Sequence, residues 1–176
     1  VAALVRTDVT AVRAEGVKHG PEELVLKVPG RGDDFMLLHT ACNRPRRTCV
    51  LSGVGRVFKQ SAGEGAVKHV FMGDTNARSR MHDARAPPSH RAGKHLEEML
   101  RERGLVVVND TGYSYFSKSG KSNIDLIITR TPSFVRSWRR LAGNGRDHAP
   151  TRAVLDWRLP ARPGSVACAS TPRVPT

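Results

Sequence analysis

Short apolar runs separated by polar turns recur along the whole chain and predict a domain rich in strands. Some runs alternate between apolar and polar positions, as a half-buried strand does, and others are continuously apolar, as a central strand is. Gly, Pro, Asn and Asp, which favour turns, stand between many of these runs. The predicted strands span residues 2–6, 23–28, 35–41, 67–72, 105–108, 113–116, 124–129, 135–141 and 153–157.

Two segments repeat apolar residues at the spacing of an amphipathic helix, over residues 48–60 and 90–103. Ser89 is expected to cap the start of the second helix, and Gly104 is expected to end it. A helix with one apolar stripe packs that stripe against a sheet or another helix. The stripes are Leu51, Val54 and Phe58 in the first helix and Leu96, Met99 and Leu100 in the second.

This mixture of strands and helices predicts an α/β fold of the α+β kind. The chain has 176 residues, of which 39% are hydrophobic, so it is long enough for one domain with a sizeable core. We expect this domain to span residues 1–158, because Pro, Ala, Ser and Arg dominate from Leu159 onward. Residues 159–176 are predicted to be a disordered tail or linker.

The beginning of the chain does not look like a natural start. Val1 is not an initiator methionine, and the chain begins in the middle of a predicted strand, so we expect that sequence is missing upstream. Arg6 and Asp8 interrupt the opening apolar run, which therefore does not resemble a signal peptide. No apolar run of the sequence approaches the length needed to span a membrane.

Positive charge is in large excess and is spread along the chain. The sequence has 29 Lys and Arg against 16 Asp and Glu, which gives a formal net charge of +13 and a pI near 10.8. This balance favours a polyanionic partner, with DNA as the first candidate. The alternative is a basic surface kept for solubility, or a compositional bias toward Arg.

The first polar motif, Gly-Asp-Thr-Asn-Ala at residues 73–77, follows the strand predicted at 67–72. Alternate residues of an extended segment point the same way, so Asp74 and Asn76 are expected to face one cleft. A carboxylate there can activate a water or protonate a leaving oxygen, and an amide can donate to a phosphate oxygen. The alternative is an ordinary turn, because Gly, Asp and Asn all favour turns.

The other two motifs place a carboxylate and a histidine at strand ends. Asp125 lies in an otherwise apolar strand, where a buried carboxylate is costly without a partner, so we expect it to orient a histidine. His148 can act as a general base or as a cation on phosphate, and Asp147 can bind Mg²⁺. A solvent-facing strand end and an ordinary surface loop are the alternatives. We predict that Asp74, Asn76, Asp125, Asp147 and His148 converge on one cleft.

These motifs occur in an order that resembles a known superfamily. Residues 73–77 (GDTNA), 122–126 (SNIDL) and 147–150 (DHAP) are similar to the late motifs of the endonuclease/exonuclease/phosphatase superfamily. The resemblance implies a four-layered sandwich of two mixed sheets flanked by helices, incomplete here at the N-terminus. It also implies hydrolysis of phosphodiester bonds with Mg²⁺, or with Mn²⁺ in its place.

A second stretch narrows the resemblance. Residues 90–96 (HRAGKHL) leading into 104–110 (GLVVVND) are similar to a helix and strand of the apurinic-type endonuclease domain of non-LTR retrotransposons. The resemblance covers residues 1–158 and is strongest from residue 69. Such domains nick target DNA to prime reverse transcription, so the resemblance implies a nuclear site of action.

The resemblance assigns a role to each residue of the predicted cleft. It implies that Asp74 activates the nucleophile or protonates the leaving group, and that Asn76 stabilises the pentavalent phosphate. It implies that Asp125 orients His148, and that Asp147 binds or positions the metal.

Some positions depart from the family pattern. The early Asn and the metal-binding Glu of the family lie before the segment that resembles Val1–Arg6 and are absent from this sequence. Cys42 stands where a Tyr is frequent, Thr75 where Phe is usual and Arg146 where Ser is usual. Three functions stay open: a DNA endonuclease, a remnant that binds nucleic acid without cutting it, and a phosphatase of small phosphoesters. We expect this chain alone to nick DNA slowly or not at all.

Overall fold

The computed structural model describes the chain in several stretches. The strand predicted at residues 2–6, the predicted cap Ser89 and the predicted domain boundary at residue 158 lie outside them. The described residues are 11–13, 23–30, 35–42, 50–60, 68–86, 88, 90–109, 112–142 and 147–156.

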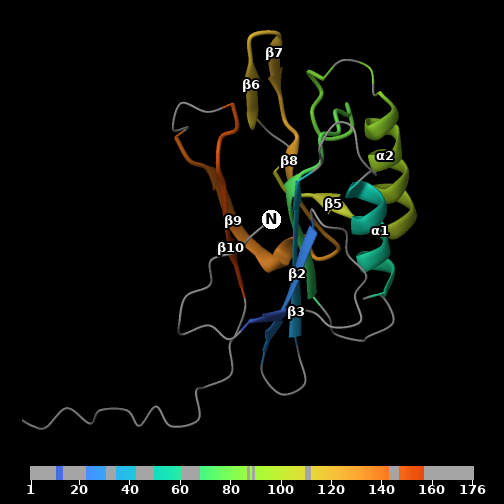
Figure 1. Cartoon of the computed structure of the whole chain (residues 1–176), viewed down its shortest axis with the longest axis vertical. Coiled ribbons are helices and arrows are strands. Elements are labelled where there is room, and N and C mark those ends of the chain that lie inside the picture. Colours follow the sequence, from blue (N-terminus) through green and yellow to red (C-terminus); the bar gives the residue numbers. More distant parts are fainter. Residues whose placement is uncertain are drawn as a thin grey trace, which may run out of the picture.

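A six-stranded mixed sheet forms the centre of the molecule (Figure 1). The strands lie in the order β1-β2-β3-β4-β8-β5, and only β3 and β4 run parallel to each other. The continuous apolar runs predicted for a buried sheet thus occupy its middle. The bounds are Val12–Arg13 for β1, Glu23–Pro29 for β2, Phe35–Cys42 for β3, Lys68–Asp74 for β4, Val106–Val107 for β5 and Asp125–Thr129 for β8.

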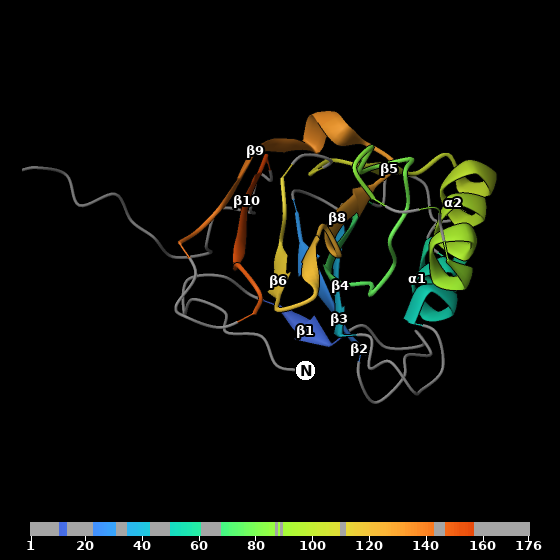
Figure 2. The same ribbon diagram turned by 90° about the horizontal axis from the view of Figure 1, so that it is seen from above.

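Two helices, α1 (Val50–Gln60) and α2 (Arg91–Arg103), cover one face of this sheet (Figure 2). The predicted apolar stripes of both helices are buried beneath them. The predicted cap Ser89 is wrong by one position, because His90 is the N-cap and its ring nitrogen accepts the Gly93 N–H. Gly104 ends α2 as predicted, in the left-handed conformation that glycine adopts without strain. Among the described residues, no helix is long and apolar enough to cross a membrane.

A second group of strands lies on the opposite face of the central sheet (Figure 2). β9 (Val135–Arg140) and β10 (Thr151–Leu155) form an antiparallel pair, preceded by a short 3₁₀ turn. β6 (Tyr115–Ser117) and β7 (Gly120–Ser122) form a hairpin, although the sequence predicted only a turn where β7 lies. Helices, central sheet and second strand group are three layers. The predicted fourth layer is not seen among the described residues and stays a prediction.

Side chains of β4 and β8 alternate between two cores. Phe71, Leu126 and Ile128 pack toward the helices, whereas Val70 and Ile127 pack toward β9 and β10. Burial of each such side chain stabilises the fold by about 1.5–3 kcal/mol. The same alternation directs the residues at the ends of the two strands, because positions two apart share a face.

Candidate active site

Two carboxylates lie opposite each other where β4 ends and β8 begins. Asp74 is the last residue of β4 and is the register partner of Asp125, the first residue of β8. Strand alternation places Asp125 on the face of Ile127, toward the second strand group. Gly73 allows β3 and β4 to approach here, because a Cβ at Gly73 would lie 2.2 Å from the Ala41 carbonyl oxygen. The fold therefore brings the first and second motifs together.

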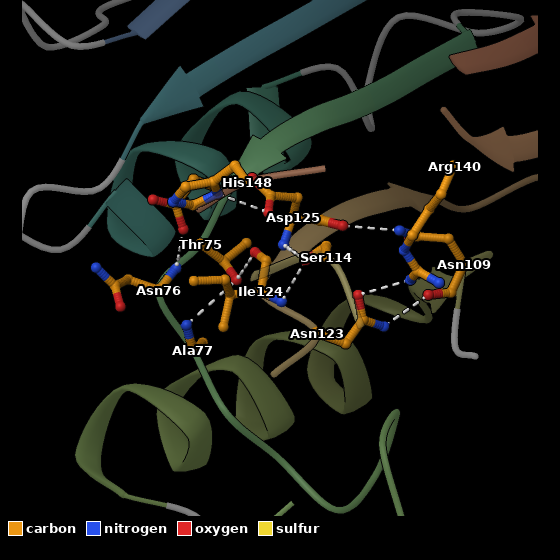
Figure 3. Close-up of polar contacts among 11 residues, drawn as sticks. Thr75, Asn76, Ala77, Asn109, Ser114, Asn123, Ile124, Asp125, Arg140 and His148 are labelled. Carbon is orange, nitrogen blue, oxygen red and sulfur yellow. Dashed lines mark hydrogen bonds and ion pairs between the residues drawn. The ribbon is translucent and has the colours of Figure 1, made fainter. Parts of the chain in front are cut away.

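His148 joins the carboxylates from the loop before β10. Its Nδ1–H donates a hydrogen bond to Asp125 Oδ2 at 2.9 Å (Figure 3). A carboxylate that accepts from Nδ1 fixes the orientation of the ring and leaves Nε2 for another partner. The His148 side chain is 41% exposed and that of Asp125 is 20% exposed. The imidazole is thus held on one side by protein and is open to a substrate on the other.

The pKa of the Asp74 carboxyl group is raised in this site. Burial, and to a smaller extent the neighbouring Asp125 carboxylate, raise the pKa of Asp74 from 3.8 to a net value of about 6. The Asn76 N–H, which donates to Asp74 Oδ1 at 2.8 Å, and His148 act in the opposite direction and lower the pKa. A carboxyl group that titrates near neutrality is suited to proton transfer.

Asn76 and Asp147, the other two predicted site residues, are not part of the Asp125–His148 contact. Asn76 follows Asp74 in a left-handed conformation, with φ of 48°, and is half-buried. Asp147 precedes His148, and its backbone carbonyl accepts the Phe116 N–H at 2.7 Å. The Asp147 side chain is exposed, and its carboxylate makes no hydrogen bond or ion pair within the described part of the chain. The structure brings Asp74, Asp125 and His148 together and leaves the Asp147 carboxylate outside that contact.

The carboxylates of this site are the candidate donor groups for the predicted metal. Mg²⁺ takes one or two carboxylates together with water or phosphate oxygens. Within the described stretches, no group of three or more His, Cys, Asp or Glu side chains is arranged to hold a metal ion. The Asp125 carboxylate already accepts a hydrogen bond from His148. The described residues thus hold no three-ligand group, and Mg²⁺ binding through Asp147 stays a prediction.

Strand β6 holds the histidine loop against β8, a role that the sequence did not reveal. The buried Ser114 hydroxyl accepts the N–H groups of Ile124 at 3.0 Å and Asp125 at 2.9 Å. The Ser114 carbonyl accepts the Ala149 N–H at 2.7 Å, which ties the residue after His148 to the same point. The Tyr115 ring lies beside the His148 ring, with 4.8 Å between centroids. The only signal for Ser114 in the sequence is its position as a polar residue between two tyrosines of the strand predicted at 113–116.

A cavity of about 320 Å³ opens beside the Asp125–His148 pair. It lies at the end of β4 and β8, where β3 and the start of β10 complete its wall. Its size is in the range of small-molecule sites. A substrate group in this cavity would contact both members of the pair. The lining residues include Thr40, Met72, Ile127, Pro150 and Thr151.

Comparison with known proteins identifies the class that this fold and site define. The family model of endonuclease-reverse transcriptases matches residues 36–152, and the chain belongs to this family. The superfamily predicted from the three motifs is thereby confirmed. No curated protein sequence matches the chain.

One solved structure shares the fold of this chain. The chain is similar to the endonuclease domain of TRAS1, a telomere-specific non-LTR retrotransposon, with 19% identity and a TM-score of 0.66. The match covers 82% of this chain and 65% of the TRAS1 chain, so this chain spans about two thirds of that domain. An endonuclease/exonuclease/phosphatase family protein from Bacteroides thetaiotaomicron is more distant, with 14% identity over 74% of this chain and 53% of that one and a TM-score of 0.42. The cytolethal distending toxin of Haemophilus ducreyi has 14% identity over 85% of this chain and 58% of that one, and a TM-score of 0.44.

Proposed function

We propose that this chain hydrolyses phosphodiester bonds of DNA as the endonuclease domain of a retroelement. The observation that supports this most is the contact of Asp125 with His148, beside Asp74 and at the edge of one cavity. Family membership supports phosphodiester hydrolysis. The net charge of +13 supports DNA as the substrate, and chromosomal DNA as the target implies action in the nucleus.

Each residue has a proposed step in this reaction. Asp125 holds the His148 ring so that Nε2 points to the phosphoryl group, where the imidazolium stabilises developing negative charge. Asp74 accepts a proton from the attacking water, since a group with a pKa of about 6 is mostly ionised at pH 7 and still basic. Asn76 donates from its amide to a phosphoryl oxygen.

A divalent cation, Mg²⁺ or Mn²⁺, enters the proposal through the family. Asp147 is the carboxylate that we propose to hold it, together with ligands from outside the described residues. Such an ion, when bound, offsets negative charge on the phosphoryl oxygens. The steps assigned to Asp74, Asp125 and His148 do not depend on its placement.

A second candidate is a remnant that binds DNA without cutting it. Cys42 favours this candidate, because it is the register partner of Asp74 on β3, in a segment where the family often has a Tyr. The side chain of Cys42 is outside the described part of the structure.

One pair of assays separates the two candidates. Duplex DNA is titrated into the full chain at 50 mM and 200 mM salt, and supercoiled plasmid is then incubated with Mg²⁺ or with EDTA. If the chain contacts 6–10 phosphates, the increase in salt concentration should weaken binding by about 10³–10⁵-fold. Slow, EDTA-sensitive nicking supports the endonuclease. Salt-sensitive binding without any nicking would support the remnant, and salt-independent binding would contradict DNA recognition through charge.

A further inference from the structure

At the edge of the central sheet next to Asp125, a side chain makes hydrogen bonds to the β8 backbone where strand pairing between β5 and β8 ends. β5 has only two residues, Val106 and Val107, which pair with Thr129 and Ile128 of β8. The Val108 N–H continues this pairing by donating to the Ile127 carbonyl at 2.9 Å. Beyond Val108, the chain no longer runs as a strand alongside β8.

The Asn109 carboxamide takes over from the backbone at this point. The residue is fully buried. Its Oδ1 accepts the Ile127 N–H at 2.6 Å, and its Nδ2 donates to the Asp125 carbonyl at 2.7 Å. A carboxamide carries the same N–H donor and C=O acceptor as a peptide group, so it can replace the next peptide of a ladder. Both backbone groups of β8 that face this edge are thereby satisfied, as buried backbone groups must be.

Asn109 is itself fixed through a short chain of polar contacts (Figure 3). Its backbone carbonyl accepts from Asn123 Nδ2 at 2.8 Å. Asn123 Oδ1 in turn accepts from Arg140 Nη2 at 3.0 Å, which links β8 to the second strand group at β9. These contacts fix the backbone of Asn109, from which its carboxamide reaches β8.

We propose that Asn109 is a positioning residue that sets the backbone of Asp125 so that its carboxylate meets His148. The proposal rests on the function proposed above. Asp125 begins its strand, so only Asp74 on β4, the Ser114 hydroxyl and the Asn109 carboxamide fix its backbone laterally among the described residues. Loss of the carboxamide leaves the Asp125 carbonyl and the Ile127 N–H without partners on one side. A displacement of about 1 Å in a catalytic group can lower a rate about 10²-fold.

The test uses the full chain and reads the histidine directly. Two-bond ¹H–¹⁵N spectra of selectively labelled protein show which ring nitrogen of His148 carries the proton in the neutral imidazole. In the wild type, donation to Asp125 favours the Nδ1–H form. Asn109→Leu removes both contacts at similar volume, and Asn109→Asp keeps the acceptor and removes the donor. Both variants are expected to shift His148 toward the Nε2–H form that a free imidazole prefers.

A matched control lies at the other end of the same strand. The buried Thr129 hydroxyl donates to the His69 carbonyl at 2.9 Å, so Thr129→Val also removes a buried polar contact of β8. It should lower the melting temperature and leave the His148 tautomer unchanged. A folded Asn109→Asp protein in which His148 keeps the wild-type tautomer would overturn the proposal. If Asn109→Leu does not fold, the Asn109→Asp variant serves as the test.

The outcome is independent of catalysis. If the tautomer shifts in the Asn109 variants while the wild type shows no nicking, the positioning role stands and the proposed function fails. If the wild type nicks plasmid, the Asn109 variants should nick it about 10²-fold more slowly. Wild-type nicking with unchanged rates and tautomer in both variants would leave the function intact and reject the role of Asn109.

Discussion

The two ends of the β4–β8 pair differ sharply in chemistry, although the same backbone ladder joins them. At one end Val70 pairs with Thr129 and Phe71 with Ile128, and all four residues are buried. At the other end Asp74 pairs with Asp125, which places two carboxylates side by side. The first end is stabilised by burial itself. The two carboxylates of the second end are stabilised by hydrogen bonds from the Asn76 N–H and from His148, because burial of unpaired carboxylates is unfavourable.

This difference separates stability from function along one pair of strands. Residues of the apolar end contribute to folding and do not reach the cavity beside His148. At the acidic end, the pKa of Asp74 is raised to about 6, so its ionised state is unfavourable at neutral pH. Substitution of Phe71 and substitution of Asp74 should therefore have opposite effects on stability.

His148→Ala is expected to have the largest effect at the acidic end. Loss of one group that stabilises the developing charge costs about 10²–10³ in rate, and nicking should fall by this factor while the fold persists. Plasmid nicking and the melting temperature are measured together. The matched control is His95→Ala on α2, which removes a partly exposed histidine distant in sequence from the three motifs. Equal nicking by His148→Ala and the wild type would remove the assigned mechanism.

Phe71→Ala tests the apolar end. Removal of a fully buried Phe lowers the free energy of unfolding by about 3–5 kcal/mol. Phe116 is 41% exposed on β6, so Phe116→Ala should change it by much less. Urea denaturation of both variants gives the comparison. Similar losses in the two proteins would show that β4 is not a core strand.

Ser114→Ala tests the hydrogen bonds that support the acidic end. It leaves the buried N–H groups of Ile124 and Asp125 without an acceptor, which should lower the free energy of unfolding by about 1–3 kcal/mol. Ser122 is also buried, but its hydroxyl makes no hydrogen bond with other described residues. Ser122→Ala should therefore be close to neutral in the same denaturation experiment. A reversed order would contradict the support assigned to Ser114.

Asp74→Asn should stabilise the protein, in contrast to the other variants. The pKa of Asp74 is raised in the folded state from 3.8 to about 6, so its favourable contribution is present below pH 3.8 and is lost as the pH rises through 6. At pH 7.5 the neutral amide should therefore increase the free energy of unfolding by about 1–3 kcal/mol. At pH 3.5 the variant and the wild type should be nearly equal. Destabilisation at pH 7.5 would show that the Asp74 charge is favourably paired.

The sequence predicted the elements and motifs that depend on neighbouring residues. It did not predict side-chain contacts that form only when strands distant in sequence lie side by side. The apolar runs predicted β4 and β8, and the polar motifs predicted the meeting of Asp125 with His148. The contribution of Asn109 could not be predicted, because a side chain that continues a ladder is recognisable only once β5 and β8 are neighbours. Ser114 was hidden for the same reason. The shift of the α2 cap to His90 reflects a ring nitrogen acting where a hydroxyl was expected.

The pH dependence of nicking tests the central claim most directly. The Mg²⁺-dependent rate of the full chain is measured between pH 5 and pH 8, in the wild type and in Asp74→Asn. If Asp74 accepts the proton from water, the wild-type rate falls as the pH drops through about 6, where Asp74 becomes protonated. The variant should be slow throughout and should lack this limb. An identical profile and rate in both proteins would contradict the assignment of Asp74, Asp125 and His148 as one catalytic group.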